Sequence, residues 1–179
     1  TRVKNMRSLA LLLSALSLTV PAQAATVLSV GDGDTITVRE EGVKVHIRLA
    51  CIDAPEMKQA PYGKASRDAL KNMLPTGTKV GLKDVETDRY GRTVAEVLKG
   101  KYNINQEQVS SGNAFVYWRY IKGCDRNAYA DLEERARSRK AGIWSEPGGI
   151  ERPWEFRKEH KEHDFPFLSL SEKFTFPRG

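Results

Sequence analysis

Residues 26–56 read TVLSVGDGDTITVREEGVKVHIRLACIDAPE and carry the pattern of three β-strands. Apolar and β-branched residues alternate or run together over 26–30, 35–38 and 43–49, and this spacing is typical of strands. Glu40-Glu41-Gly42 lies between the second and third runs and predicts a hairpin turn. The segment therefore predicts one strand followed by a β-hairpin.

The strand predicted at 43–49 divides its side chains between two faces. Successive side chains of a strand point to opposite sides, so every second residue shares a face. We expect the apolar face to lie in the core and the polar face to be exposed, with His46 a solvated residue rather than a ligand. The apolar face holds Val43, Val45, Ile47 and Leu49, and the polar face holds Lys44, His46 and Arg48.

The pattern continues on the C-terminal side of this segment. Five short strands with a helix inserted after the third predict an α+β fold, a five-stranded OB-type Greek-key β-barrel with about three helices. Such barrels commonly bind nucleic acids or sugars on one face. The further strands are predicted at 78–85 and 92–98, and the helices at 62–74, 105–112 and 125–140.

Residues 1–24 differ from the rest of the chain and have the three-part layout of a secretory signal peptide. Three basic residues precede an apolar run over 9–20, and Ala22-Gln23-Ala24 supplies a small-x-small cleavage pattern. The run is shorter than the roughly 20 residues that span a bilayer. We therefore expect cleavage after Ala24, export to the periplasm or the medium, and no stable membrane association afterwards. A buried N-terminal helix and an uncleaved anchor are the alternatives.

The composition of the 179 residues limits the class of protein. Hydrophobic residues make up 40% and charged residues 29%, which is typical of a globular domain rather than a disordered chain. The formal net charge of +6 favours an anionic partner, but three of the positive charges belong to residues 1–24. The placement of the charges, and not their sum, must therefore carry any argument for nucleic acid.

The two cysteines, Cys51 and Cys124, allow two interpretations. They are too few for a cysteine zinc cluster. An exported protein with an even number of cysteines predicts a Cys51–Cys124 disulfide. Cys51 is also two residues after Leu49 and would share its face of a strand. This position predicts a buried apolar residue with a free thiol. The sequence leaves both interpretations open.

Three short segments concentrate special residues: 31–35 (GDGDT), 48–56 (RLACIDAPE) and 88–92 (DRYGR). Each has a structural explanation by itself, as a turn, an extended loop or a charged hairpin. Together they place carboxylates and arginines at the ends of barrel strands, among them the three carboxylates Asp34, Asp53 and Glu56 and the two arginines Arg48 and Arg92. Carboxylates there can bind a hard cation, and arginines can bind phosphate.

In this order, the three segments resemble those of the staphylococcal nuclease (thermonuclease) family, the secreted calcium-dependent nucleases. The resemblance spans roughly residues 26–146 and ends at Gly142-Ile143-Trp144-Ser145-Glu146, where we expect Trp144 to pack in the core. It implies a nuclease domain over 25–146, after the signal peptide over 1–24 and before a C-terminal extension over 147–179.

The resemblance implies a metal site made of Asp34, Asp53 and the backbone carbonyl of Ala54. Calcium accepts carboxylate, carbonyl and water oxygens in irregular geometry, so this set suits Ca²⁺. The family usually has Thr where Ala54 stands. Because the implied ligand is the main chain, that change should matter little.

The resemblance also implies catalytic and substrate-binding residues. Arg48 and Arg92 would bind the scissile phosphate, because guanidinium groups match phosphate oxygens in bidentate geometry. Glu56 would activate or position the attacking water. Aromatic residues beside the site would stack on exposed bases, which favours single strands. The implied substrate-binding residues are Arg89, Tyr90, Trp118 and Tyr120.

Two functions of different classes follow from these implications. The first is a monomeric, calcium-dependent phosphodiesterase that cuts DNA and RNA to fragments with 3′-phosphate and 5′-hydroxyl ends. The alternative is a non-catalytic OB-type nucleic-acid-binding module, which can lose the carboxylates and keep the groove. A saccharide-binding barrel explains the fold but not the paired arginines. The enzyme is favoured by the joint presence of Asp34, Arg48, Asp53, Glu56 and Arg92.

Overall fold

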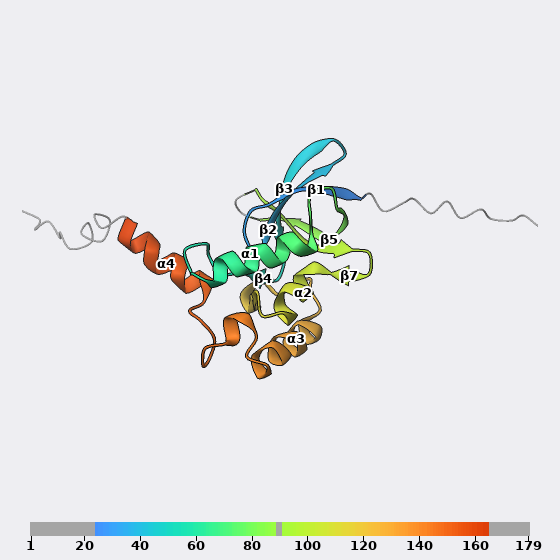
Figure 1. The fold of residues 1–179 in the computed structure, drawn as a ribbon. Helices are drawn as coiled ribbons and strands as arrows, with labels where there is room; N and C mark the ends of the chain where they lie inside the picture. The colour runs from blue at the N-terminus through green and yellow to red at the C-terminus, as the bar shows by residue number, and fades with distance from the viewer. Residues whose placement is uncertain (1–23, 89–90, 165–179) are drawn as a thin grey trace, which may run out of the picture.

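Five strands form a closed barrel at the centre of the computed structural model, which describes residues 24–88 and 91–164 (Figure 1). They are β1 (Ala25–Val30), β2 (Thr35–Glu40), β3 (Val43–Leu49), β5 (Lys79–Thr87) and β6 (Thr93–Lys99). The sheet runs in the order β3-β2-β1-β5-β6 through antiparallel pairs, and β3 also pairs with β6 in parallel, which closes the barrel. The predicted five-stranded OB-type α+β fold is confirmed.

The β2–β3 hairpin extends beyond the barrel (Figure 1). Its turn residues Glu41 and Gly42 have φ angles of 49° and 84°, which a two-residue type I′ turn requires. Val43, predicted in the core, is 62% exposed because it lies beside this turn at the tip of the hairpin. Nearer the barrel, Ile47 and Leu49 are buried and Val45 is half-buried, while His46 is exposed as predicted.

Four α-helices accompany the barrel in the part of the chain that the structure describes: α1 (Tyr62–Met73), α2 (Ile104–Ser110), α3 (Arg126–Ser138) and α4 (Pro153–Asp164). The first three agree with the predicted helices. None of the helices described is long and apolar enough to cross a membrane. The remaining short elements are β4 (Ile52–Asp53), β7 (Tyr102–Asn103), β8 (Phe115–Val116) and the 3₁₀ turns η1 (Trp118–Tyr120) and η2 (Gly142–Trp144).

Helix α4 lies in the C-terminal extension, for which the sequence predicts no element. The chain reaches α4 after α3 and η2, and the helix lies near the start of α1 (Figure 1). Its Trp154 packs on a small core cluster of Phe115, Ala136, Ile143 and Trp144, with the Phe115 and Trp154 rings 6.1 Å apart. Trp144 is buried in this cluster, as predicted. The extension is therefore attached to the domain at the start of α4.

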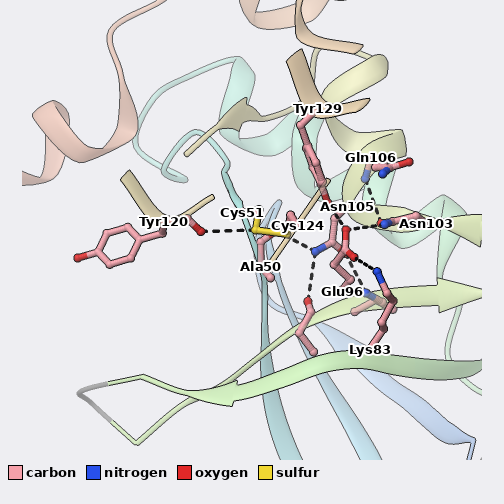
Figure 2. Close-up of a disulfide and its surroundings, with 12 residues drawn as sticks. Ala50, Cys51, Lys83, Glu96, Asn103, Asn105, Gln106, Tyr120, Cys124 and Tyr129 are labelled. Carbon is pink, nitrogen blue, oxygen red and sulfur yellow. Dashed lines mark hydrogen bonds and ion pairs between the residues drawn. A yellow bond between two sulfur atoms is a disulfide. The ribbon is translucent and has the colours of Figure 1, made fainter. Parts of the chain in front are cut away.

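A disulfide joins Cys51 to Cys124, so the first of the two interpretations of the cysteines is confirmed (Figure 2). It links the residue before β4 to the loop before α3, across 73 residues of sequence. The Sγ of Cys51 also lies 3.4 Å from the carbonyl oxygen of Tyr120. The disulfide thus connects the segment that carries Asp53 to the loop that follows η1.

A buried carboxylate lies next to the disulfide (Figure 2). Glu96 of β6 is only 1% exposed and accepts hydrogen bonds from Tyr129 at 2.7 Å and Asn103 at 2.6 Å. Lys83 pairs with its other oxygen at 2.9 Å. Burial and the bond to Glu96 raise the pKa of Tyr129 above its usual range. These contacts attach α3 to strand β6 of the barrel.

Reduction of the disulfide is expected to lower the free energy of unfolding by about 4 kcal/mol, because the bridge removes loop-closure entropy from the unfolded chain. Urea unfolding of the protein with and without reductant measures the difference. The Cys51→Ala/Cys124→Ala variant is the control, since its unfolding should not respond to reductant. Equal midpoints for oxidised and reduced wild-type protein would contradict this expectation.

Candidate active site

One cleft is lined by four of the charged residues that the sequence predicts for the site: Asp34, Arg48, Glu56 and Arg92. It has a volume of about 1040 Å³ and lies where the β1–β2 turn, the end of β3 and the loop after β4 meet. Ala54 lines it as well. Residues that are distant in the sequence therefore share one concave surface.

Arg48 holds the two predicted metal-binding aspartates on one guanidinium group. Its Nη1 donates to Oδ1 of Asp34 at 2.9 Å, and its Nη2 donates to Oδ1 of Asp53 at 2.7 Å. The second oxygen of Asp34 accepts the backbone N–H of Ala54 at 2.9 Å. Asp34 is 3% exposed and Asp53 is 0% exposed. The structure thus brings these four predicted residues together.

Local contacts fix the turn that presents Asp34. The side chain of Asp32 accepts the backbone N–H of Asp34 at 3.1 Å, as in an Asx turn. A Cβ added to Gly33 would overlap Ser66 Oγ of α1, so glycine allows the helix to approach this closely. Gln108 of α2 donates to the carbonyl oxygen of Gly33 at 2.6 Å. The turn is therefore held by two helices as well as by its own side chain.

The buried aspartates create a site that attracts positive charge. Burial raises the pKa of Asp34 to about 7, although the charge of Arg48 lowers it. A charged carboxylate taken out of water needs a cationic partner or a metal. Arg48 supplies one such charge from the polar face of β3.

The oxygen donors fit a hard divalent cation. In the described ranges, no group of three or more His, Cys, Asp or Glu side chains converges as a complete metal site. Calcium also takes main-chain carbonyl and water oxygens, so it does not need three such side chains. Asp34, Asp53 and the Ala54 carbonyl are therefore suitable as a partial ligand set that water and substrate would complete.

Glu56 lies in the loop between β4 and α1, and its side chain is 34% exposed. Its backbone N–H donates to Oε1 of Gln59 at 2.9 Å. A Cβ added to Gly63 would overlap the carbonyl oxygen of Glu56, so glycine is again needed where α1 begins. These contacts place the carboxylate at the cleft, where a proton acceptor is accessible to water.

Arg92 lies at the start of β6 and also lines the cleft. Its Nε and Nη2 both contact Oδ2 of Asp88 at 2.7 Å, and its side chain is 48% exposed. The backbone N–H of Arg92 donates to the same side chain at 2.9 Å. Arg89 and Tyr90, predicted to contact substrate, lie outside the described residues.

The structure separates the two aromatic residues predicted to bind bases. Tyr120 lines the cleft, is 51% exposed, and meets Tyr117 edge to face at 4.8 Å between ring centroids. Trp118 does not line the described part of the cleft, because its indole N–H donates to Glu133 of α3 at 3.1 Å. The chain leaves β8 at Val116 and turns into η1, so Tyr117 rather than Trp118 faces the site.

Sequence reasoning missed several residues of the cleft, and Tyr117 and Arg157 lie nearest its charged groups. Burial raises the pKa of Tyr117, and the charge of Asp53 adds to this shift. The strand before Tyr117, β8, has only two residues, so no strand period in the sequence marks it. Arg157 comes from α4, 104 residues after Asp53, and contacts both Asp53 and Glu56. No motif marks it among the charged residues of that helix.

The chain is similar to other proteins over most of its length, and two of those given below are named as a nuclease and an endonuclease. A family model described as Staphylococcal nuclease homologue matches residues 46–146. Protein ParB of Escherichia coli is 36% identical over 170 residues, which cover 86% of this chain and 94% of that protein. Micrococcal nuclease of Shigella flexneri is 37% identical over 158 residues, which cover 82% and 88% respectively. An uncharacterized endonuclease of Haemophilus influenzae is 37% identical over 136 residues, which cover 75% and 73%.

The barrel, its charged cleft and these similarities together define a nuclease, an enzyme that hydrolyses phosphodiester bonds. The chain belongs to the staphylococcal nuclease family, and the resemblance found in its motifs is confirmed.

Proposed function

We propose that the protein is a calcium-dependent phosphodiesterase that hydrolyses DNA and RNA to fragments with 3′-phosphate and 5′-hydroxyl ends. The main support is the position of Arg48 between two buried aspartates, in a cleft that Glu56 and Arg92 also line. Ca²⁺ bound by the two aspartates would neutralise negative charge on the substrate phosphate. A non-catalytic binding module would have no use for this costly buried arrangement.

The protein's own side chains divide the remaining chemistry. Arg48 donates to phosphate oxygens while its position is held by the aspartates, which stabilises the charge that develops during attack. Glu56 accepts the proton of the attacking water or holds that water in line with the leaving oxygen. Arg92 offsets charge on the leaving 5′ oxygen. Water is the nucleophile, so the ribose 2′-hydroxyl is not required and both nucleic acids are substrates.

Single strands are the preferred substrates in this proposal. Tyr120 is an exposed aromatic ring at the edge of the cleft, and an unpaired base can stack on such a ring. Arg119 and Lys122 line the same side and add positive charge for the backbone. We also propose that Arg89 and Tyr90 contact the substrate.

We propose that the protein acts as an exported monomer without lasting membrane association. The three-part composition of residues 1–24 supports export and cleavage after Ala24. The Cys51–Cys124 disulfide is compatible with an oxidising compartment such as the periplasm or the medium.

The full chain is expected to degrade single-stranded DNA and RNA with Ca²⁺ and to stop when a chelator removes it. Magnesium should support much less turnover, because two carboxylates and a carbonyl do not impose its octahedral geometry. Product ends are identified by labelling: a 5′-hydroxyl accepts phosphate from a kinase directly, and a 3′-phosphate blocks polymerase extension until a phosphatase removes it. A folded variant with Asp131→Asn, an exposed change on α3, is the control.

Three outcomes would contradict the proposal. Full activity in chelator would exclude the calcium requirement, and 5′-phosphate ends would exclude the assigned leaving oxygen. Binding of nucleic acid without cleavage under any cation would favour the non-catalytic module.

A further inference from the structure

We propose that α4 is an autoinhibitory latch: Arg157 lies on the carboxylates of Asp53 and Glu56 and must leave them before a cation and the attacking water can use those groups. This inference rests on the proposed function of the same cleft. It adds a regulatory contact from the C-terminal extension, outside residues 46–146 that the family model matches.

The contacts of Arg157 cover the oxygens that the reaction needs. Its Nη2 donates to Oδ2 of Asp53 at 2.7 Å, and its Nη1 lies 3.1 Å from Oδ1 of the same residue. The same Nη1 donates to Oε1 of Glu56 at 2.7 Å. Because Arg48 also donates to Oδ1, both oxygens of Asp53 are bonded to guanidinium groups.

The arrangement places a positive charge where a metal ion would have to bind. Asp53 is fully buried, and Arg157, which lines the cleft, contacts both of its carboxylate oxygens. Arg48 already donates to Oδ1 of Asp53, so a cation would use Oδ2, and the guanidinium group of Arg157 on that oxygen would repel it. Burial alone would lower the pKa of Arg157, but its bonds to Asp53 and Glu56 raise it, so this charge is permanent. Competition must therefore be resolved by movement of Arg157, not by loss of its proton.

Trp154 holds Arg157 in this position. The two residues are three apart in α4 and therefore lie on one face of the helix. The Trp154 ring stacks on Tyr117 at 4.9 Å with an interplanar angle of 3°. Gln59, in the loop after Glu56, donates to the carbonyl oxygen of Glu151 at 3.0 Å just before α4. One face of the helix thus covers both the acidic groups and the aromatic wall of the cleft.

The start of α4 is attached to the domain, so the latch opens by movement of the Arg157 side chain. The ion pairs of Arg157 are partly accessible, since its side chain is 34% exposed. A polyanionic substrate that enters the cleft offers phosphate oxygens to Arg157 in place of the carboxylates. Substrate and cation therefore open the latch together.

The Arg157→Gln variant of the full chain tests the latch by its affinity for Ca²⁺, measured by calorimetry without nucleic acid. A site that is latched about nine-tenths of the time has an apparent affinity about tenfold below its intrinsic value. We therefore expect Arg157→Gln to bind Ca²⁺ about tenfold more tightly than wild type. Arg135→Gln, an exposed change on α3, is the matched control and should leave the affinity unchanged.

Trp154→Ala provides a second test that leaves all the carboxylates and arginines in place. It should raise the Ca²⁺ affinity in the same direction by loosening α4, and thermal melts identify any variant that fails to fold. Equal or weaker binding by both folded variants would overturn the latch, while calcium-dependent cleavage by wild type would still uphold the proposed function. Absence of Ca²⁺ binding by wild type and variants alike would instead overturn the calcium site itself, and the latch with it.

Discussion

The Asp53→Asn variant is expected to lose nuclease activity by about a thousandfold or more. A catalytic metal supplies several kcal/mol of charge stabilisation, and each tenfold in rate corresponds to about 1.4 kcal/mol. Asparagine keeps the shape of the side chain but removes the charge from a fully buried position in the predicted ligand set. Calcium affinity should fall together with turnover.

The structure changes what this variant should do to stability. From the sequence alone, removal of one of two neighbouring carboxylates is expected to cost little, because the pair would repel. In the structure Asp53 is paired with Arg48 and with Arg157, so the change leaves two cations less compensated. We expect the free energy of unfolding to fall by about 2 kcal/mol. This is less than the cost of breaking a fully buried ion pair, because both arginines are partly exposed.

Cleavage rates, calorimetric titration with Ca²⁺ and urea unfolding measure the three effects separately. Asp131→Asn, which removes an exposed carboxylate from α3, should change none of them. If Asp53→Asn keeps a tenth or more of wild-type turnover, or binds Ca²⁺ as wild type does, the assignment of Asp53 to the cation is wrong.

The barrel could be predicted because each strand carries its own signal. Alternation of apolar and polar residues over 43–49 identifies both the strand and the face to which Arg48 belongs. It fails at Val43, which is exposed because the hairpin extends past the barrel. Local pattern determines which residues share a face, but it does not determine where along the strand the core ends.

The site could be predicted only where its residues lie in short motifs. Asp34, Arg48 and Asp53 belong to two such segments, and the structure brings them into contact. Tyr117 lines the cleft where the sequence predicts Trp118. The strand before it, β8, has only two residues and is too short to show a period. Arg157 reaches the site through docking of α4, which depends on tertiary contacts and leaves no local pattern.

The Glu56→Gln variant is expected to lower turnover by roughly 10²- to 10⁴-fold, the range that a positioned proton acceptor contributes. Glutamine has nearly the same shape, and the backbone bond from residue 56 to Gln59 does not involve the changed group. The loop should therefore keep its conformation. The new side chain can still accept a hydrogen bond from Arg157, but it cannot take a proton from water.

Binding and chemistry should separate in this variant, because Glu56 is not among the predicted cation ligands. Loss of the 2.7 Å ion pair with Arg157 removes a contact that holds the latch closed, so Ca²⁺ affinity should stay equal or rise. Single-turnover cleavage and Ca²⁺ titration on the same sample show whether only the chemical step has slowed. Glu134→Gln on α3 is the matched control for an exposed glutamate. Should turnover fall less than about tenfold, Glu56 would be neither the proton acceptor nor the residue that positions the water, and the nucleophile would have to be activated elsewhere in the cleft.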